Sequence, residues 1–263
     1  MRRGTAEGII LKISDYGEAD CLLWLLTPAF GIMRVLARSG RKSVKRFGGR
    51  ILLFNRLEFG YSRRRENQTA AIENAKMLET YPELFSDAVR FGRCALFAEV
   101  FLQAWGEGDP APQAYEFLLD YLRRSEAHKE TADRHVLDSF RLLEILGHRP
   151  VFDLCASCGS KLEKSNMFSV NEGGTVCEIC AKEETARLAG RGGTFPFRVS
   201  SAVRKTIEQS YKDPKRLNRV RFNAKSRSEA EKLWLANIQA ITGRTPKSVD
   251  YLAKLEEGQK RRK

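Results

Sequence analysis

The chain has 263 residues, 42% of them hydrophobic and 30% charged, and carries a net charge of +13. It is long enough for two or three folding units, and its composition excludes both a single small domain and a disordered protein. The longest apolar run is too short to cross a bilayer and the first residues lack the apolar core of a signal peptide, so we expect a cytoplasmic protein without membrane contact.

The positive charge is concentrated at the two ends of the chain. Residues 1–80 carry 15 basic and 8 acidic side chains, and residues 181–263 carry 21 and 9, whereas the middle of the chain is mildly acidic. A uniformly solvated surface would not divide its charge in this way. The distribution predicts that the ends bind a polyanion.

Short runs of β-forming residues follow one another in the first 80 residues, separated by turn signals. They begin at Gly8, Asp20, Gly31, Ile51 and Asn67. Five short strands of this kind are typical of a small closed barrel. We therefore predict a five-stranded OB-fold in residues 1–80.

From Pro82 onward the apolar residues recur every three or four positions, which predicts helices. The expected helices span residues 82–105, 112–126, 132–146, 202–211 and 229–241, with a short one around 249–255. The sequence Ser228-x-x-Glu231 forms a capping box, so it predicts where the fifth of these helices begins. The fold class is α+β, a barrel followed by a helical domain.

Four of the six cysteines form two Cys-x-x-Cys pairs, Cys155 with Cys158 and Cys177 with Cys180. Four thiolates on two such turns suit a tetrahedral zinc ion, and the hairpin tip at 171–174 completes a zinc ribbon inserted in the helical domain. Because four cysteines fill the coordination sphere, no position remains for a reacting water, and we predict one structural zinc. Unligated or redox-active thiols and a rubredoxin-like iron site are the alternatives.

The rest of the sequence offers little for catalysis. Nucleotide-binding, hydrolase and zinc-protease motifs are absent, and the three histidines have the spacing of ordinary surface or core residues. The pair Glu183-Glu184 is more typical of a solvated helix face than of an acid and a base. We expect a protein that is not an enzyme.

The strongest candidate for function is a basic cluster that begins in the third predicted strand. Strand alternation puts Arg34 and Arg38 on the face opposite Met33 and Val35, so basic side chains line one face while apolar ones fill the barrel. A phosphate backbone could lie along that face, and a merely solvated face is the alternative. The cluster and its flank comprise Arg34, Arg38, Arg41, Lys42, Lys45, Arg46, Arg63, Arg64 and Arg65.

Three aromatic residues lie among these basic positions, namely Phe47, Phe54 and Tyr61. They could stack on bases, as aromatic residues do in single-strand binders, although core packing is the more ordinary role for each of them. A second candidate DNA surface lies in the basic terminal region and comprises Lys215, Arg216, Arg219 and Arg221.

The ordered set of barrel, helices, inserted four-cysteine unit and terminal helices resembles the bacterial recombination mediator family RecO over nearly the whole chain. The stretches EGIILKISDYGEADCLLWLLTPAFGIMRVLARSGRKS and ENAKMLE carry the resemblance in the first domain. The loop SGRKSVKRFGG fits the family's pattern only approximately. The expected domains are the barrel (1–80), the two parts of the helical domain (81–150 and 183–243), the zinc ribbon (151–182) and a basic tail (244–263).

The resemblance implies a DNA repair and recombination mediator that is not an enzyme. Such a protein binds single- and double-stranded DNA without sequence specificity, acts with RecR, contacts the C-terminal tail of single-strand-binding protein, helps to load the recombinase RecA and anneals complementary strands. The tail would dock in the apolar helical part that begins at Leu84. By position, the four cysteines match zinc ligands, and the basic residues of the third strand and its following loop match a DNA-binding surface. Many relatives lack a complete cysteine set, so the resemblance does not make zinc essential.

Two other classes of protein share some of these features. A zinc-ribbon RNA-binding protein or transcription factor has the same basic charge and barrel, and RNA-versus-DNA competition would separate it from a mediator. A metal-dependent nuclease or glycosylase would show magnesium- or substrate-dependent strand loss.

Overall fold

The computed structural model describes residues 2–43, 47–64, 68–162, 166–190, 193–213, 217 and 219–260. The chain divides into two compact units, Met1–Glu130 with Pro246–Lys263, and Thr131–Thr245. In the described part of the chain, no helix has the length and apolar character needed to cross a membrane.

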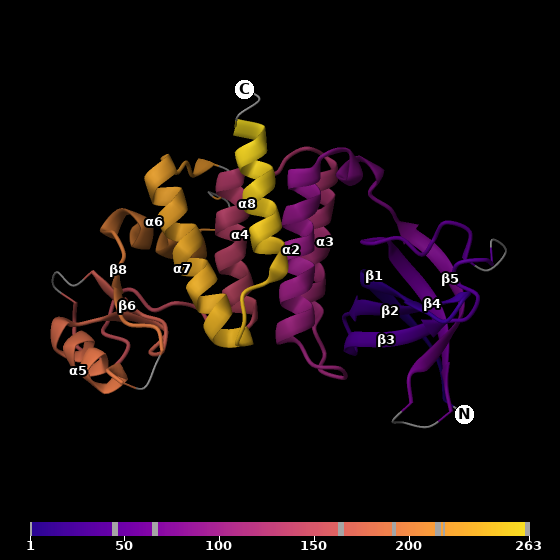
Figure 1. The fold of residues 1–263 in the computed structure, drawn as a ribbon, viewed down its shortest axis with the longest axis horizontal. Coiled ribbons are helices and arrows are strands. Elements are labelled where there is room, and N and C mark those ends of the chain that lie inside the picture. The colour runs from indigo at the N-terminus through magenta and orange to yellow at the C-terminus, as the bar shows by residue number, and fades with distance from the viewer. Residues whose placement is uncertain are drawn as a thin grey trace. The chain divides into compact units, whose positions relative to one another are not determined.

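The first unit begins with a closed barrel, drawn in indigo to purple in Figure 1. Its strands are β1 (Arg2–Tyr16), β2 (Asp20–Thr27), β3 (Gly31–Ala37), β4 (Arg56–Arg63) and β5 (Ala70–Glu79). The order around the barrel is β1-β2-β3-β5-β4, in which β3 and β5 pair in parallel and the other neighbours are antiparallel. The predicted five-stranded OB-like barrel is confirmed.

Alternation along the strands fills the barrel with apolar side chains. Leu23 and Leu25 of β2 and Val35 of β3 point inward and are fully buried. A β-bulge between Ile10 and Lys12 shifts the alternation of β1, so that Lys12 takes an outward position. The inside of the barrel is therefore closed, and any ligand must bind on its outer face or at its ends.

Three strands begin at residues other than the expected ones, and the last of them, β5, begins at Ala70 and not at Asn67. β1 begins at Arg2 because its first half pairs with β4, from Arg2 opposite Arg63 to Ile9 opposite Arg56. The apolar run that begins at Ile51 first forms a loop. Phe54 in that loop has a positive φ of 68° and is buried, with its ring 5.6 Å from that of Phe91. Apolar content alone does not distinguish such a buried loop from a strand.

Helices complete the first unit: η1 (Pro82–Ser86), α2 (Ala88–Ala104), α3 (Pro112–Glu126) and α8 (Lys247–Lys260). α8 lies along α2 (Figure 1), where Gly92 leaves room for Leu252. The Glu99 carboxylate accepts the backbone N–H groups of Lys247 and Ser248 at 2.8 and 2.9 Å, which caps the start of α8. The expected basic tail is thus largely a helix that packs on the first unit.

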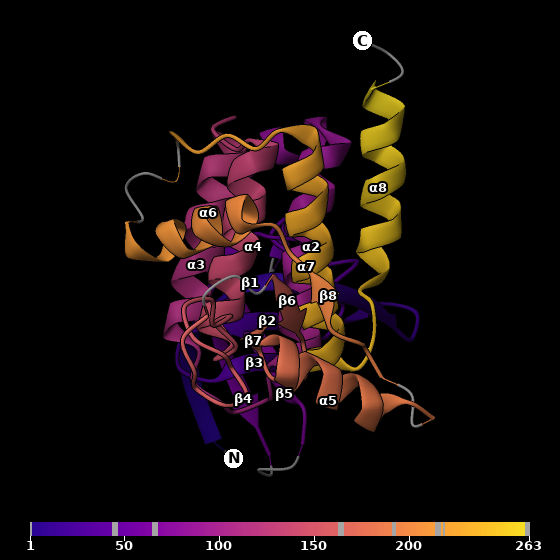
Figure 2. The same ribbon diagram turned by 90° about the vertical axis from the view of Figure 1, so that its left-hand side faces the viewer.

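The second unit contains the helices α4 (Ala132–Ile145), α6 (Ser201–Lys212) and α7 (Ala224–Thr242). The segment that carries the four cysteines, called the ribbon, contains β6 (Met167–Ser169), β7 (Gly174–Val176), α5 (Glu178–Leu188) and β8 (Phe197–Arg198). It extends past the expected end at residue 182, because β8 pairs with β6. α6 lies across α4 and α7 (Figure 2). The capping-box prediction was wrong. Asn223 caps α7 by accepting the Ser226 N–H at 2.8 Å, so Ser228 lies inside the helix.

The two units group the helices differently from the expected domains. α2 and α3 belong with the barrel, α4 belongs with α6 and α7, and α8 returns to the first unit. Periodicity shows that a helix has an apolar face but not which neighbour covers it.

A charged network joins the barrel to α3 within the first unit. Arg56 of β4 donates hydrogen bonds to Glu7 at 3.0 Å, to Glu79 at 3.4 Å and to the hydroxyl of Tyr115 at 3.0 Å. Arg123 also donates to Glu79, at 2.8 and 2.9 Å. Arg123, and then Arg56, hold the pKa of the Glu79 carboxyl below its usual value.

We expect Arg56→Leu to lower the free energy of unfolding by about 2 kcal/mol, because the partly buried Glu7 would lose its cation and Glu79 would keep only Arg123. Arg41→Leu is the control. It removes an ion pair with Asp15 whose side chains are both more than half exposed, and should cost less than about 1 kcal/mol. Urea unfolding measures both variants, and equal costs would contradict the network's role. Glu79 stabilises the fold above the ordinary carboxyl pKa, and this stabilisation is lost as the pH falls through its lowered folded pKa. Arg123 is the larger cause of that lowering and Arg56 the smaller, so only the Arg56 part of the cost of Arg56→Leu should be lost in acid.

Candidate metal centre and nucleic-acid interface

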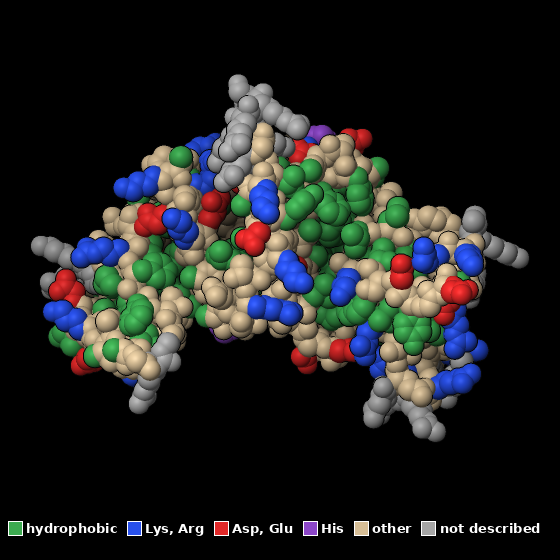
Figure 3. All heavy atoms as spheres, in the orientation of Figure 1, with side chains coloured by type: hydrophobic (Ala, Val, Ile, Leu, Met, Phe, Trp, Pro, Cys, Tyr) green, Lys and Arg blue, Asp and Glu red, His purple; other side chains and the backbone are tan. Residues whose placement is uncertain are grey.

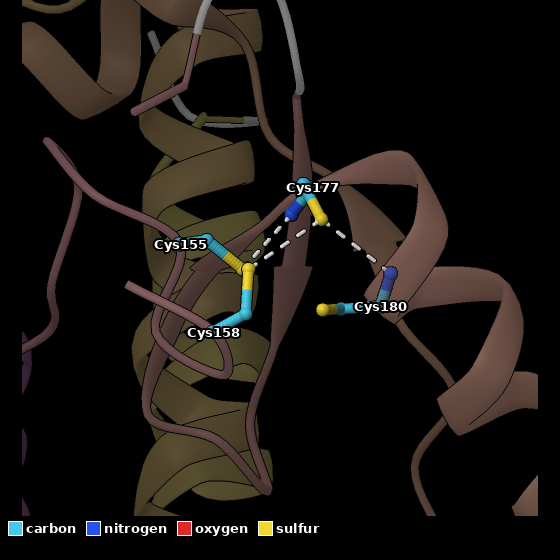
Figure 4. Close-up of side chains that lie close together, drawn as sticks. All are labelled: Cys155, Cys158, Cys177 and Cys180. Atoms are coloured by element: carbon cyan, nitrogen blue, oxygen red, sulfur yellow. Dashed lines mark hydrogen bonds between the residues drawn. The ribbon is translucent and has the colours of Figure 1, made fainter. Parts of the chain in front are cut away.

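The two Cys-x-x-Cys pairs meet at one point in the second unit (Figure 4). Cys155 and Cys158 lie on a loop that turns at Gly159, which has a positive φ of 72°, whereas Cys177 caps the N-terminus of α5 and Cys180 lies in its first turn. All four sulfur atoms lie within 4.8 Å of one another. A tetrahedron with metal–sulfur bonds of about 2.3 Å has edges of about 3.8 Å, so the cluster is compatible with a metal site.

Hydrogen bonds favour the ionised sulfur of Cys155 and Cys158. The backbone N–H of Cys177 donates to the sulfur of Cys155 at 3.3 Å. Hydrogen bonds from Ser160 lower the pKa of Cys158 to about 6, whereas the neighbouring sulfur of Cys177 raises the pKa of Cys180 to about 12. Four thiolates this close repel one another, so full ionisation requires a cation among them. Soft thiolates as the complete donor set favour a soft or borderline metal ion.

A buried carboxylate holds the hairpin beside the cluster. Glu184 of α5 is 4% exposed and accepts hydrogen bonds from Ser169 and Asn171, both at 2.7 Å. The expectation of a solvated Glu183-Glu184 face therefore fits Glu183, which is exposed, and not Glu184. Glu184 fixes the β6–β7 turn and with it the approach of Cys177.

The outer face of β3 presents the first residues of the predicted basic cluster. Arg34 and Arg38 are exposed, while Met33 and Val35 on the opposite face are buried. Lysine and arginine side chains gather over the barrel, at the right of Figure 3.

Arg41 and Lys42 follow in the turn after β3 and are also exposed. The same turn is fastened to the β1–β2 connection, because the Ser39 N–H donates to Asp20 at 2.7 Å and Arg41 lies 3.4 Å from Asp15.

The second part of the predicted cluster lies at the end of β4. Ser62, which precedes Arg63, pairs with Ala71 of β5, and Ala71 pairs with Leu36 of β3. Arg63 forms an ion pair with Glu107 at 3.7 Å, and Arg64 is exposed.

Several of the predicted DNA-binding residues lie outside the described part of the chain, namely Lys45, Arg46, Arg65, Lys215 and Arg216. In the second unit, Arg219 and Arg221 are exposed, and Arg219 lines a pocket at the end of α6 together with Lys212.

The aromatic residues near the basic cluster belong mainly to the core. Phe47 and Phe54 are each 1% exposed, which leaves their rings no access to a base. Tyr61 is partly buried against the barrel core, with the Phe30 ring 6.2 Å away in an edge contact.

Two residues of the basic face were not predicted from the sequence. Lys12 of β1 pairs with Trp24 of β2, which pairs with Arg34 of β3, so the three form one row across the outer face. The Lys12 ammonium lies 4.6 Å from the centroid of the Trp24 ring. Alternation in β2 gives a signal for Trp24, but the bulge in β1 hides the outward position of Lys12.

A closed barrel with a basic outer face, followed by helices and a four-cysteine cluster, defines a class of barrel protein suited to a polyanionic ligand. The chain matches two family models, "Recombination protein O N terminal" over residues 1–81 and "Recombination protein O C terminal" over residues 86–250. The chain belongs to the RecO family of DNA repair proteins, and the resemblance seen in the sequence is confirmed.

Individual relatives agree with the family match, and each carries the description "DNA repair protein RecO". The protein of Roseiflexus sp. is 31% identical over 94% of this chain and 83% of its own length. The protein of Syntrophobacter fumaroxidans is 30% identical over 67% and 71%, and that of Myxococcus xanthus is 28% identical over 97% and 99%.

Proposed function

We propose that this chain is a recombination mediator without catalytic activity, which binds single- and double-stranded DNA without sequence specificity and anneals complementary strands. The observation that carries the proposal is the exposed basic face of the barrel, with Arg34, Arg38 and Lys42 on one strand and its following turn. Membership of a DNA repair family supports it.

The mechanism follows from charge rather than from base recognition. Lysine and arginine contacts to phosphates release condensed counterions, which gives affinity that does not depend on sequence. Strands held in this way repel each other less while their bases remain free to pair. The exposed Arg219 and Arg221 of the second unit would contribute to a second strand site.

The test is a triple variant of the barrel face, Arg34→Ala with Arg38→Ala and Lys42→Ala. If each contacts a phosphate of single-stranded DNA, the slope of log affinity against log salt should fall in magnitude by about 2, from roughly 0.7 per contact. The loss of affinity should be similar for every base sequence, and strand annealing should slow. The measurement is fluorescence anisotropy with labelled oligonucleotides at several salt concentrations.

The matched control removes the same charge elsewhere in the first unit, through alanine at the exposed Lys129, Lys247 and Lys254. This control should keep the parent slope. A folded barrel-face variant with the parent's affinity, salt slope and annealing rate would show that the basic face is only solvated. RNA that competes better than DNA, or magnesium-dependent strand loss, would assign the chain to one of the other classes.

We propose that the four-cysteine cluster holds one structural zinc ion. Cys155, Cys158, Cys177 and Cys180 supply four thiolates, the donor set that zinc prefers in closed sites. The bound ion would tie the loop at Cys155 to the start of α5. No ligand position is left for a substrate, which agrees with a structural role.

We also propose that the chain acts with RecR, binds the C-terminal tail of single-strand-binding protein and thereby helps to load RecA. Leu84, where the tail groove was expected to begin, is fully buried, but the neighbouring Phe85 is half exposed and its ring lies 5.4 Å from that of Phe91. An acidic and apolar tail could place its apolar end on this ring.

Titration of a labelled tail peptide against the full chain tests this contact, with a peptide of the same composition in scrambled order as the control. Saturable binding in the tens of micromolar range is expected only for the native order, and its absence would remove the tail from the proposed partners.

A further inference from the structure

We propose that Trp24 is a stacking platform for one unpaired base of single-stranded DNA, with Lys12 and Arg34 contacting the phosphates on either side. The inference rests on the proposed DNA-binding function. It adds a base contact to a surface that otherwise recognises only phosphate, and it makes this part of the barrel selective for single strands.

The position of Trp24 in the sheet places it on the outer face. Its neighbours along β2, Leu23 and Leu25, are fully buried inside the barrel, whereas Trp24 itself is only partly buried. The ring is therefore not part of the barrel core. Strands in a sheet lie about 4.8 Å apart, so Lys12 and Arg34, two strands apart, have backbones separated by about 10 Å with the indole between them.

The apolar residues at the far end of this outer face are covered, whereas Leu22 and Leu36, in the row next to Trp24, are partly buried as Trp24 is. Ile9, Leu26 and Ile32 form the row at the opposite end of the strands, and each is at most 6% exposed. Helices α2 and α3 pack against β1 and β2 in the same unit. Trp24 lies beyond this cover, so a large aromatic ring remains partly exposed beside basic side chains.

The charges around the ring suit a nucleic-acid strand. Arg34 is exposed, and among the described residues no carboxylate forms an ion pair with it. The Lys12 ammonium already lies over the ring at 4.6 Å, which shows that a cation can reach it. Base stacking is worth more than a cation–π contact at an exposed site, so an arriving base should displace the flexible lysine, whose ammonium then contacts a phosphate.

A stacking contact has a different signature from a phosphate contact. Loss of the ring should weaken binding of an unpaired strand without releasing fewer counterions, so the affinity should fall while the salt slope stays constant. An abasic strand of equal length carries the same phosphates without bases, and a duplex keeps its bases in the stack. Both should be insensitive to the ring.

The experiment compares the full-length parent with Trp24→Ala and Trp24→Phe on three ligands: a thymine oligonucleotide, an abasic oligonucleotide of the same length and a duplex. Trp24→Ala should bind the thymine oligonucleotide roughly ten-fold more weakly, with the parent's salt slope, and should bind the other two ligands as the parent does. Trp24→Phe keeps an aromatic face and should recover most of the loss. In the parent, the thymine oligonucleotide should quench tryptophan fluorescence more than in Trp24→Phe, and the abasic strand should not.

The other outcomes separate a failure of the Trp24 inference from a failure of the proposed DNA-binding function. Parent-like binding by Trp24→Ala, with no difference in quenching, overturns the inference while DNA binding stands. Equal weakening on the thymine and abasic strands, or a reduced salt slope, also overturns it, because Trp24 would then only support Arg34. A parent that binds none of the three ligands would refute the proposed function itself. If Trp24→Ala does not fold, the quenching comparison between the parent and Trp24→Phe still decides the question.

Discussion

Replacing Gly31 with alanine is expected to lower the free energy of unfolding by at least about 3 kcal/mol. Gly31 begins β3 with a positive φ of 58°. A Cβ atom there would lie 2.1 Å from the carbonyl oxygen of Asp109 and 3.0 Å from that of Gly106. The backbone of this loop cannot withdraw freely, because Gly106 accepts the Ile32 N–H and the Gly108 N–H donates to Phe30 at 3.0 Å.

Gly17→Ala is the matched control for this variant. Gly17 has nearly the same backbone conformation, with a φ of 64°, but an added Cβ would meet nothing within 4 Å. Gly17→Ala should lower the free energy of unfolding by only about 1 kcal/mol, because alanine adopts a positive φ less readily than glycine. Urea unfolding of both variants isolates the close approach between β3 and the loop after α2. If the two variants lower the free energy of unfolding equally, the close approach of β3 to this loop contributes nothing to stability.

The barrel was predictable because five short runs of β-forming residues follow one another between turn signals. In β3 the inward Met33, Val35 and Ala37 are apolar, and Arg34 and Arg38 fall on the other face, so the basic face could be predicted from the sequence. The four cysteines were predictable for a different reason. Their spacing alone restricts them to two tight turns, whatever the rest of the fold does.

The row of Lys12, Trp24 and Arg34 was not predictable, because it depends on pairing between strands. Register is a property of the assembled sheet, and the bulge in β1 shifts it by one residue. Local sequence does not contain this information. The aromatic residues nearest to the basic cluster in sequence, Phe47 and Phe54, proved to be core residues.

The predictions of helix ends and of helix partners failed for a similar reason. Asn223 and Ser228 both have side chains that cap helices, and the choice between them depends on where the preceding chain allows the helix to start. The position of α8 against α2 depends on Gly92 and Glu99, which lie far away in the sequence. Such long-range contacts decide which unit a helix joins.

If the four-cysteine cluster holds the proposed zinc ion, removal of that ion is expected to unfold the ribbon. The apolar core around the cluster is small, with Cys155, Val176 and Ala181 as its buried members. Such a core does not offset the entropy of ordering the loop and hairpin. In zinc-finger peptides the bound ion contributes roughly 10–16 kcal/mol, more than enough to close this gap.

Cys158→Ser tests the contribution of a single ligand, because it replaces a soft thiolate by a poorly donating hydroxyl in an exposed loop position. Protein purified without chelator should contain one zinc per chain, and the variant less. Amide exchange should lose its protection in the β6–β7 hairpin and in α5, both in the variant and after chelation of the parent. Protection in the barrel and the affinity for single-stranded DNA should stay close to the parent's, because the basic face lies in the other unit.

Lys182→Ala is the control for this variant, since it changes an exposed residue of α5 and leaves all four thiolates and the hydrogen bonds to them in place. It should retain both the metal and the exchange protection. Parent protein without any metal would refute the zinc assignment. A chelated parent that keeps full protection in the hairpin and α5 would show that the ribbon folds through its own packing, and that the ion, if bound, adds little to it.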